Sequence, residues 1–181
     1  MKKYILLLSL FLLWSCFWIG EDNQNAGLSL KQTETFSMSV PWAWREVSPS
    51  DIPNPRTGKL VFAYSSPTER QWYFNNLVVL EAANSLWESS LSLMQNTKVW
   101  LEASLDAFYI IEEENISFVD ESQWLLLIYD AKYNVSTPKL TYLQTARACW
   151  DTNYFMTISL AEKPENYNRY ETLLSTFSCK N

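Results

Sequence analysis

The 181-residue chain is acidic, with 20 Asp and Glu residues against 14 Lys and Arg, a formal net charge of −6 and no histidine. No basic cluster interrupts this acidity, which argues against nucleic acid as a partner and against purely electrostatic attachment to anionic lipid. The missing histidine excludes histidine-based catalytic triads, whereas three glycines and nine tryptophans favour a sheet-rich, tightly packed fold.

The chain opens with MKKYILLLSLFLLWSCFWIGEDNQ, two lysines followed by an apolar run. Residues 4–19 would extend roughly 24 Å as a helix, which falls short of the roughly 30 Å of a hydrocarbon core. A positive start, an apolar run and a small residue before a cut point are typical of an export signal. We therefore predict a signal peptide over residues 1–15.

The cut point predicts a lipid anchor. Leu13-Trp14-Ser15-Cys16 resembles the lipobox of bacterial lipoprotein precursors, in which cleavage precedes a cysteine that becomes acylated. An uncleaved signal anchor or a cut elsewhere are the alternatives, and all three export the chain. Several acyl chains on Cys16 would hold the protein stably. We expect it on a cell membrane, facing the extracytoplasmic side, with the membrane as a partner through the lipid.

Residues 16–32 are predicted to form the lipidated cysteine and a tether, because Glu21 to Gln32 are polar and without period. One domain is then expected over residues 33–181. It begins with a strand in which Phe36, Met38 and Val40 alternate with polar residues, and Trp44 should fold back onto the core.

Short apolar runs at residues 60–65 and 75–82 predict two central strands. Ser85 and Glu88 fit a capping box, which predicts a long helix that ends between Ala103 and Phe108. Its core-facing stripe is predicted from residues that recur at helical spacing: Trp87, Leu91, Met94, Leu101, Leu105 and Phe108.

Four further alternating stretches, at residues 109–118, 123–133, 140–150 and 154–162, are joined by short links and predict an antiparallel meander. A final helix entered through Pro164 would carry Tyr167, Tyr170, Leu174 and Phe177 on one face. The predicted fold class is α+β, an antiparallel sheet of about six to seven strands sandwiched by a long central helix and a C-terminal helix.

This order of elements resembles the PsbP-like and DcrB-like exported proteins. The resemblance lies in Phe36-x-Met38-x-Val40-Pro41 with a tryptophan after it, the long helix, the meander and a closing helix that ends in Ser175-Thr176-Phe177. It implies an antiparallel sheet with helices on both faces, and an accessory protein that supports an envelope protein complex. The histidines by which some relatives bind metals or partners are missing, so no metal or cofactor is implied.

Once Cys16 is lipidated, Cys149 and Cys179 remain. One lies on a late predicted strand and the other just past the helix that covers the sheet, and export permits oxidation. We predict a disulfide between them; two reduced, buried thiols are the alternative.

No catalytic residues are predicted, and we expect no enzyme. Ser136 and Lys139 match a serine-x-x-lysine pattern, but they lie in a predicted turn instead of a helix start. Glu112, Glu113 and Glu114 could hold calcium only if they converged, which alternation along a strand prevents.

Trp42, Trp72 and Tyr73 fall in predicted loops. Exposed rings there could anchor a protein partner or stack on wall polysaccharide, or they could fold down to cover the sheet ends. The leading hypothesis is a non-enzymatic domain that binds an envelope protein, and the alternative is a carbohydrate recognition module.

Overall fold

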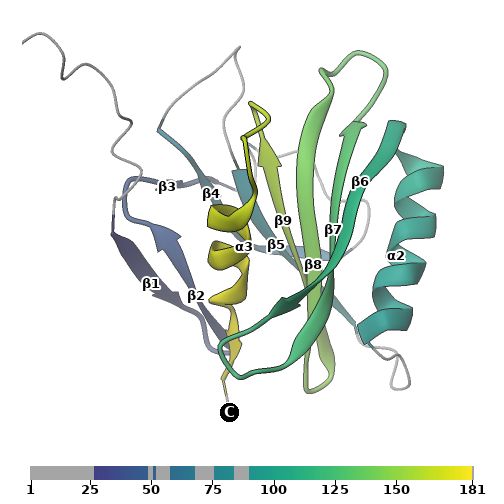
Figure 1. Ribbon diagram of the computed structural model, residues 1–181. Coiled ribbons are helices and arrows are strands. Elements are labelled where there is room, and N and C mark those ends of the chain that lie inside the picture. The colour runs from purple at the N-terminus through teal and green to yellow at the C-terminus, as the bar shows by residue number, and fades with distance from the viewer. Residues whose placement is uncertain (1–26, 49–50, 52–57, 68–75, 84–89, 181) are drawn as a thin grey trace, which may run out of the picture.

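The computed structural model describes residues 27–48, 51, 58–67, 76–83 and 90–180, which form two antiparallel sheets and two helices (Figure 1). Cys16, Trp72 and Tyr73 lie outside these residues. The helices are α2 (Ser90–Ser104) and α3 (Asn168–Ser175).

The larger sheet has the strand order β3-β4-β5-β9-β8-β7-β6. Its strands are β3 (Arg45–Glu46), β4 (Lys59–Ser65), β5 (Asn76–Ala83), β6 (Asp106–Ser117), β7 (Gln123–Lys132), β8 (Leu140–Cys149) and β9 (Thr152–Leu160). Each neighbouring pair is antiparallel, and β6 to β9 form the meander predicted from their alternating residues.

The smaller sheet contains β1 (Leu28–Gln32), β2 (Phe36–Pro41) and β10 (Ser178–Cys179), in the order β1-β2-β10. The predicted opening strand is therefore present, but it does not belong to the main sheet. Phe36, Met38 and Val40 are fully buried because β2 turns this face toward the main sheet. The sandwich thus has a small sheet and α3 on one face, where a single C-terminal helix was expected.

The predicted tether over residues 16–32 is too long, and the domain starts before residue 33. Leu28–Gln32 form a strand that pairs with β2, with Leu28 opposite Pro41 at one end and Gln32 opposite Ser37 at the other. The strand was missed because its two leucines point outward, while the polar residues between them are half-buried. In an ordinary half-buried strand the apolar residues are the buried ones.

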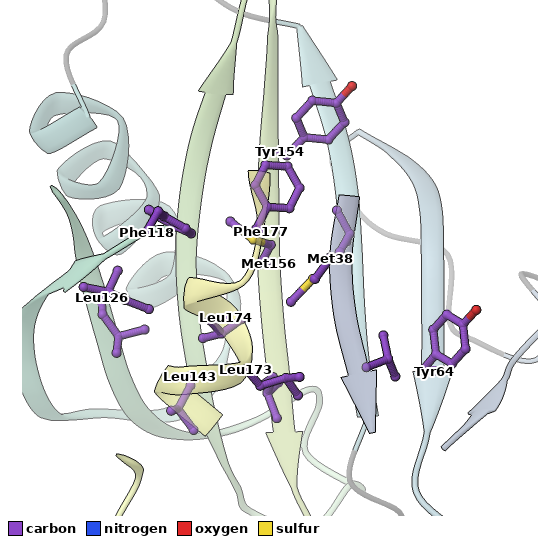
Figure 2. Packing of buried hydrophobic residues seen from close by; sticks show 14 of the residues in the cluster. Met38, Tyr64, Phe118, Leu126, Leu143, Tyr154, Met156, Leu173, Leu174 and Phe177 are labelled. Atoms are coloured by element: carbon purple, nitrogen blue, oxygen red, sulfur yellow. The ribbon is translucent and has the colours of Figure 1, made fainter. Parts of the chain in front are cut away.

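The main core lies between the large sheet and the layer formed by β2 and α3 (Figure 2). Leu173 and Leu174 from α3 and Phe177 after it are buried against the sheet. The Phe177 ring stacks on Phe36 at a centroid distance of 5.0 Å and lies 5.5 Å from Tyr154. These contacts connect the chain's end to β2 and β9.

A second core fills the other face, under α2. Leu93, Met94 and Leu101 are buried against Leu127 and Tyr129 of β7. Figure 1 shows α3 beside the small sheet, with α2 on the other side of the meander. Helices do cover both faces of the sheet, as predicted.

Both helices differ in detail from their predictions. The predicted start of α2 at Ser85 lies outside the described residues; its end at Ser104 falls in the predicted interval, and Phe108 belongs to β6. Leu91 is 52% exposed, so its assignment to the core stripe was wrong.

The helix α3 begins at Asn168 instead of Pro164. Its first backbone hydrogen bonds are donated to the Tyr167 carbonyl by the N–H groups of Tyr170 and Glu171.

Candidate functional site

A disulfide joins the end of β8 to the end of the chain, as predicted. Cys149 and Cys179 are bonded with their Cα atoms 5.6 Å apart and at a sequence separation of 30. Cys179 also pairs with Phe36 across the small sheet. The bond therefore links the main sheet to the layer that covers it.

The residues after the disulfide are held as well. The backbone N–H of Lys180 donates to the Thr35 carbonyl at 2.9 Å, and its Nζ donates to the Thr33 carbonyl at 2.6 Å. The Tyr154 hydroxyl lies 2.8 Å from Thr35 Oγ1. The β1–β2 turn and the C-terminal residues thus form one fixed surface.

Trp150 lies beside this surface, next to Lys180, and was not singled out from the sequence. It was assigned to a strand over residues 140–150, with a turn at Asp151-Thr152-Asn153. The register instead pairs Cys149 with Thr152, so Trp150 and Asp151 alone make the hairpin turn, and Asn153 is buried in β9. The available signal was a two-residue link between two alternating strands.

Both the backbone and the side chain of Trp150 are unusual. Its φ of 57° lies in the left-handed region, which costs a residue with a Cβ about 1–2 kcal/mol and where such turns normally place Asn or Gly. Its side chain is 77% exposed, although Nε1 donates to the Lys180 carbonyl at 3.4 Å. A large apolar ring presented to solvent from a strained turn indicates a role at the surface.

We call this region the disulfide end and define it as Thr33–Thr35, Phe118–Ser122, Trp150–Asp151 and Ser178–Lys180. In Figure 1 the C-terminus lies at the end of the molecule that carries the β6–β7 and β8–β9 turns. The backbone N–H of Val119 donates to the Ser175 carbonyl at 3.1 Å, and the Val119 side chain is 64% exposed. The exposed carboxylates here are Glu34, Asp120, Glu121 and Asp151. These carboxylates form an acidic rim on the surface that also carries exposed Trp150 and Val119 and the basic Lys180.

Buried Arg147 fixes one part of that rim. Its guanidinium forms an ion pair with Asp120 and lies 5.3 Å from the Phe118 ring centroid and 5.8 Å from that of Trp124. Burial acts to raise the pKa of Asp120, but hydrogen bonds from Ser122 and the Arg147 charge outweigh it and lower the pKa below its usual value. Because the Arg147 charge offsets that of Asp120, the acidic character of the rim rests on Glu34, Glu121 and Asp151.

Trp42 lies at the other end of the small sheet. Its backbone N–H donates to the Gly27 carbonyl at 3.0 Å, and its side chain is 68% exposed, so for Trp42 the alternative of folding down onto the sheet is wrong. Trp44, in contrast, is buried as predicted. Because β2 runs from Phe36, opposite Cys179, to Pro41, the two ends are roughly 20 Å apart.

The acidic stretch of β6 does not gather its three side chains. Glu113 forms an ion pair with Lys98 of α2, whereas Glu112 and Glu114 face Glu171 of α3 on the opposite side. Burial, followed by the charge and hydrogen bond of Glu114, raises the pKa of Glu171. In the described part of the chain, no three Cys, Asp or Glu side chains are placed to hold a metal ion.

Ser136 lies in the predicted turn, where its N–H and hydroxyl donate to Asn134 Oδ1 at 3.0 and 2.7 Å. This arrangement closes a local turn and engages no base. Neither α2 nor α3 has the length and apolar composition needed to cross a membrane.

Comparison with known proteins identifies the fold. No protein-family model and no curated protein matches the sequence. Among solved structures, the cyanobacterial PsbP protein (CyanoP) of Synechocystis sp. PCC 6803 is similar, with 15% identity, a TM-score of 0.57, and 91% of this chain and 97% of CyanoP covered. A Pseudomonas aeruginosa protein of unknown function is similar at 12% identity and a TM-score of 0.53, with 82% and 94% covered. At such identities the likeness concerns the fold, and this chain has a PsbP-like fold.

Proposed function

We propose that this protein is a lipid-anchored, non-enzymatic domain on the extracytoplasmic side of a cell membrane, where it binds another envelope protein through the disulfide end. The observation that carries the proposal is Trp150, exposed and held in a left-handed turn that favours smaller residues. A smaller residue such as Gly or Asn would suit the left-handed turn better than tryptophan.

The anchor rests on the N-terminal sequence, in which an export signal leads to Cys16. The Cys149–Cys179 disulfide supports an oxidising compartment outside the cytoplasm. The PsbP-like fold supports the accessory role that the family resemblance implies.

The chemistry of the disulfide end defines its partner. Tryptophan is enriched among the residues that dominate binding energy in protein interfaces, where it fills a pocket on the other protein. The acidic rim would steer and orient a partner whose pocket is surrounded by Lys or Arg. We therefore expect a protein with an apolar pocket and a basic border.

A polysaccharide site is the weaker alternative. Sugars stack on rings that lie close together, but exposed Trp42 and Trp150 are at opposite ends of β2. Trp72 and Tyr73 lie outside the described residues and add no support for such a row.

The test is quantitative co-purification of the full protein, solubilised from its own membranes. We compare the wild type with Trp150→Gly, which suits the left-handed turn, and with the control Val135→Ala, which alters another exposed apolar residue. The recovered partner should fall by about tenfold for Trp150→Gly and stay unchanged for the control. Equal recovery from all three would refute the binding surface, and an unmodified Cys16 in the mass spectrum would refute the anchor.

A further inference from the structure

The strand β1 presents apolar side chains on its outward face. Leu28 is 52% exposed and Leu30 56% exposed, and both occupy positions that alternate with the more buried Ser29 and Lys31. In the described residues β1 pairs with β2 alone, so it is an edge strand of its sheet. Exposed leucines on an edge strand are an association hazard that proteins generally avoid unless the surface is used.

Trp42 extends this apolar surface. The residue follows β2 directly, and its bond to the Gly27 carbonyl places it beside the start of β1. Leu28, Leu30 and Trp42 therefore lie together at the end of the hairpin away from its turn. We call these three residues the open end.

The charge around the open end differs from that of the disulfide end. Residues 27–32 and 36–46 include two basic side chains, Lys31 and Arg45, and one carboxylate, Glu46, which lies near the Tyr64 ring that Lys31 Nζ covers at 5.6 Å. The one acidic residue of the hairpin, Glu34, is in the turn at the other end. In an acidic protein, the open end is thus a local region that an anionic surface would not repel.

The position of the open end in the chain favours one occupant. Leu28 follows Cys16 by twelve residues, which can span at most roughly 40 Å. With acylated Cys16 in a bilayer, such a short link would keep the open end close to the lipid surface at high effective concentration. Tryptophan and leucine flanked by basic residues suit the boundary between headgroups and acyl chains.

We infer that Leu28, Leu30 and Trp42 dip into the phospholipid surface that carries the anchor. This inference rests on the proposed lipidation of Cys16. It deepens the proposed function by giving the domain a fixed orientation, in which β2 runs between the bilayer and the disulfide end. Trp150 and its acidic rim then face away from the membrane, toward a partner.

The experiment uses the full acylated protein, labelled with fluorotryptophan and reconstituted in vesicles of equal parts phosphatidylcholine and phosphatidylglycerol. Each tryptophan gives a fluorine NMR resonance. The resonance that disappears in Trp42→Phe belongs to Trp42, and the one that disappears in Trp150→Phe belongs to Trp150. A lipid spin label near the glycerol backbone should broaden the Trp42 resonance about threefold more than that of Trp150, since an inserted ring lies within roughly 10 Å of the headgroup boundary.

Two further variants test the leucines. Leu28→Ser combined with Leu30→Ser should remove most of the extra broadening of Trp42, whereas Val135→Ala should leave it unchanged, and circular dichroism checks that each variant is folded. Equal broadening of Trp42 and Trp150 in vesicle-bound, acylated wild type would overturn the inference while leaving the anchor intact. If the protein forms dimers in which Trp42 is shielded from the spin label, the membrane inference is also overturned. The open end would then bind a second copy of the protein. If mass spectrometry finds no acyl group on Cys16 and the protein dissociates from the vesicles, the proposed function is refuted instead.

Discussion

Trp150 combines two unfavourable features that a functional surface would explain. Its ring is exposed, and its backbone occupies a conformation suited to Gly or Asn. Trp150→Gly should therefore raise the free energy of unfolding by about 0.5–1 kcal/mol, because relief of strain outweighs the greater freedom of the unfolded chain. Urea unfolding at neutral pH measures the change. A loss of more than about 1 kcal/mol would mean that the ring is mainly a structural contact.

The ion pair between Arg147 and Asp120 gives a second test at this scale. In Asp120→Asn the buried guanidinium loses its partner, and stability at pH 7 should fall by about 1 kcal/mol, a modest value because water screens the partly exposed carboxylate. The lowered pKa of Asp120 means that this stabilisation exists above the unfolded-state pKa and is lost as pH falls through the folded-state value. The wild type and variant should converge in urea unfolding once the pH lies below the folded-state pKa of Asp120. A difference that is constant with pH would contradict the assigned role.

The prediction of individual residues succeeded where chemistry restricted the choice. Cys149 and Cys179 are the pair that remains once Cys16 is predicted to be lipidated, and their bonding is confirmed. Trp150 could not be predicted because its importance depends on φ and exposure, and a tryptophan between two strands has the composition of strand residues.

At the scale of elements, β10 depends on the disulfide. It has two residues, and in isolation so short a strand would contribute little pairing energy. Replacing both Cys149 and Cys179 with Ala should lower the free energy of unfolding by about 3–4 kcal/mol in the chain-entropy model. Hydrogen exchange should become faster in residues 178–180, while β8 and β9 away from the bond remain protected. Unchanged exchange in residues 178–180 would show that the packing of Phe177 and the hydrogen bonds of Lys180 hold the segment without the disulfide.

The packing of α3 on β6 carries an electrostatic penalty. Burial and then Glu114 raise the pKa of Glu171, so its charged form is disfavoured in the folded protein and stability is lost as pH rises through that pKa. Glu171→Gln should add about 0.3–0.5 kcal/mol at pH 7, where solvent screening keeps the gain small, and nothing at pH 4. Thermal unfolding at both pH values measures this, with exposed Glu165→Gln as control. An equal effect from both substitutions would exclude a specific pair with Glu114.

The sequence was most informative for elements in which the regularly spaced apolar residues are also the buried ones. The meander from β6 to β9 was predicted because its strands alternate and its links are short. The strand β1 was missed because its leucines point outward, and the sheet of β2 was misassigned because a period of two indicates a buried face without specifying which strands pair. The outer position of Leu91 on α2 likewise depends on how the helix docks.

At the scale of the whole molecule, the two ends differ in chemistry. The open end combines exposed leucines and Trp42 with Lys31, Arg45 and Glu46, whereas the disulfide end carries Trp150 together with more carboxylates than basic groups. Such a division suits a domain that contacts lipid at one end and a basic protein surface at the other. The candidate surfaces could be predicted from the sequence only in part, because Trp42 was identified as a loop aromatic but the separation of the ends follows from the fold.

Photo-crosslinking in intact cells tests this account most directly. A benzophenone amino acid is placed singly at positions 150, 42 and, as control, 135 of the full protein, and the adducts are analysed by mass spectrometry. We expect one discrete protein adduct from position 150, phospholipid adducts from position 42, and neither from position 135. The same protein adduct from positions 42 and 150, or none from position 150, would contradict a partner-binding end that faces away from the membrane.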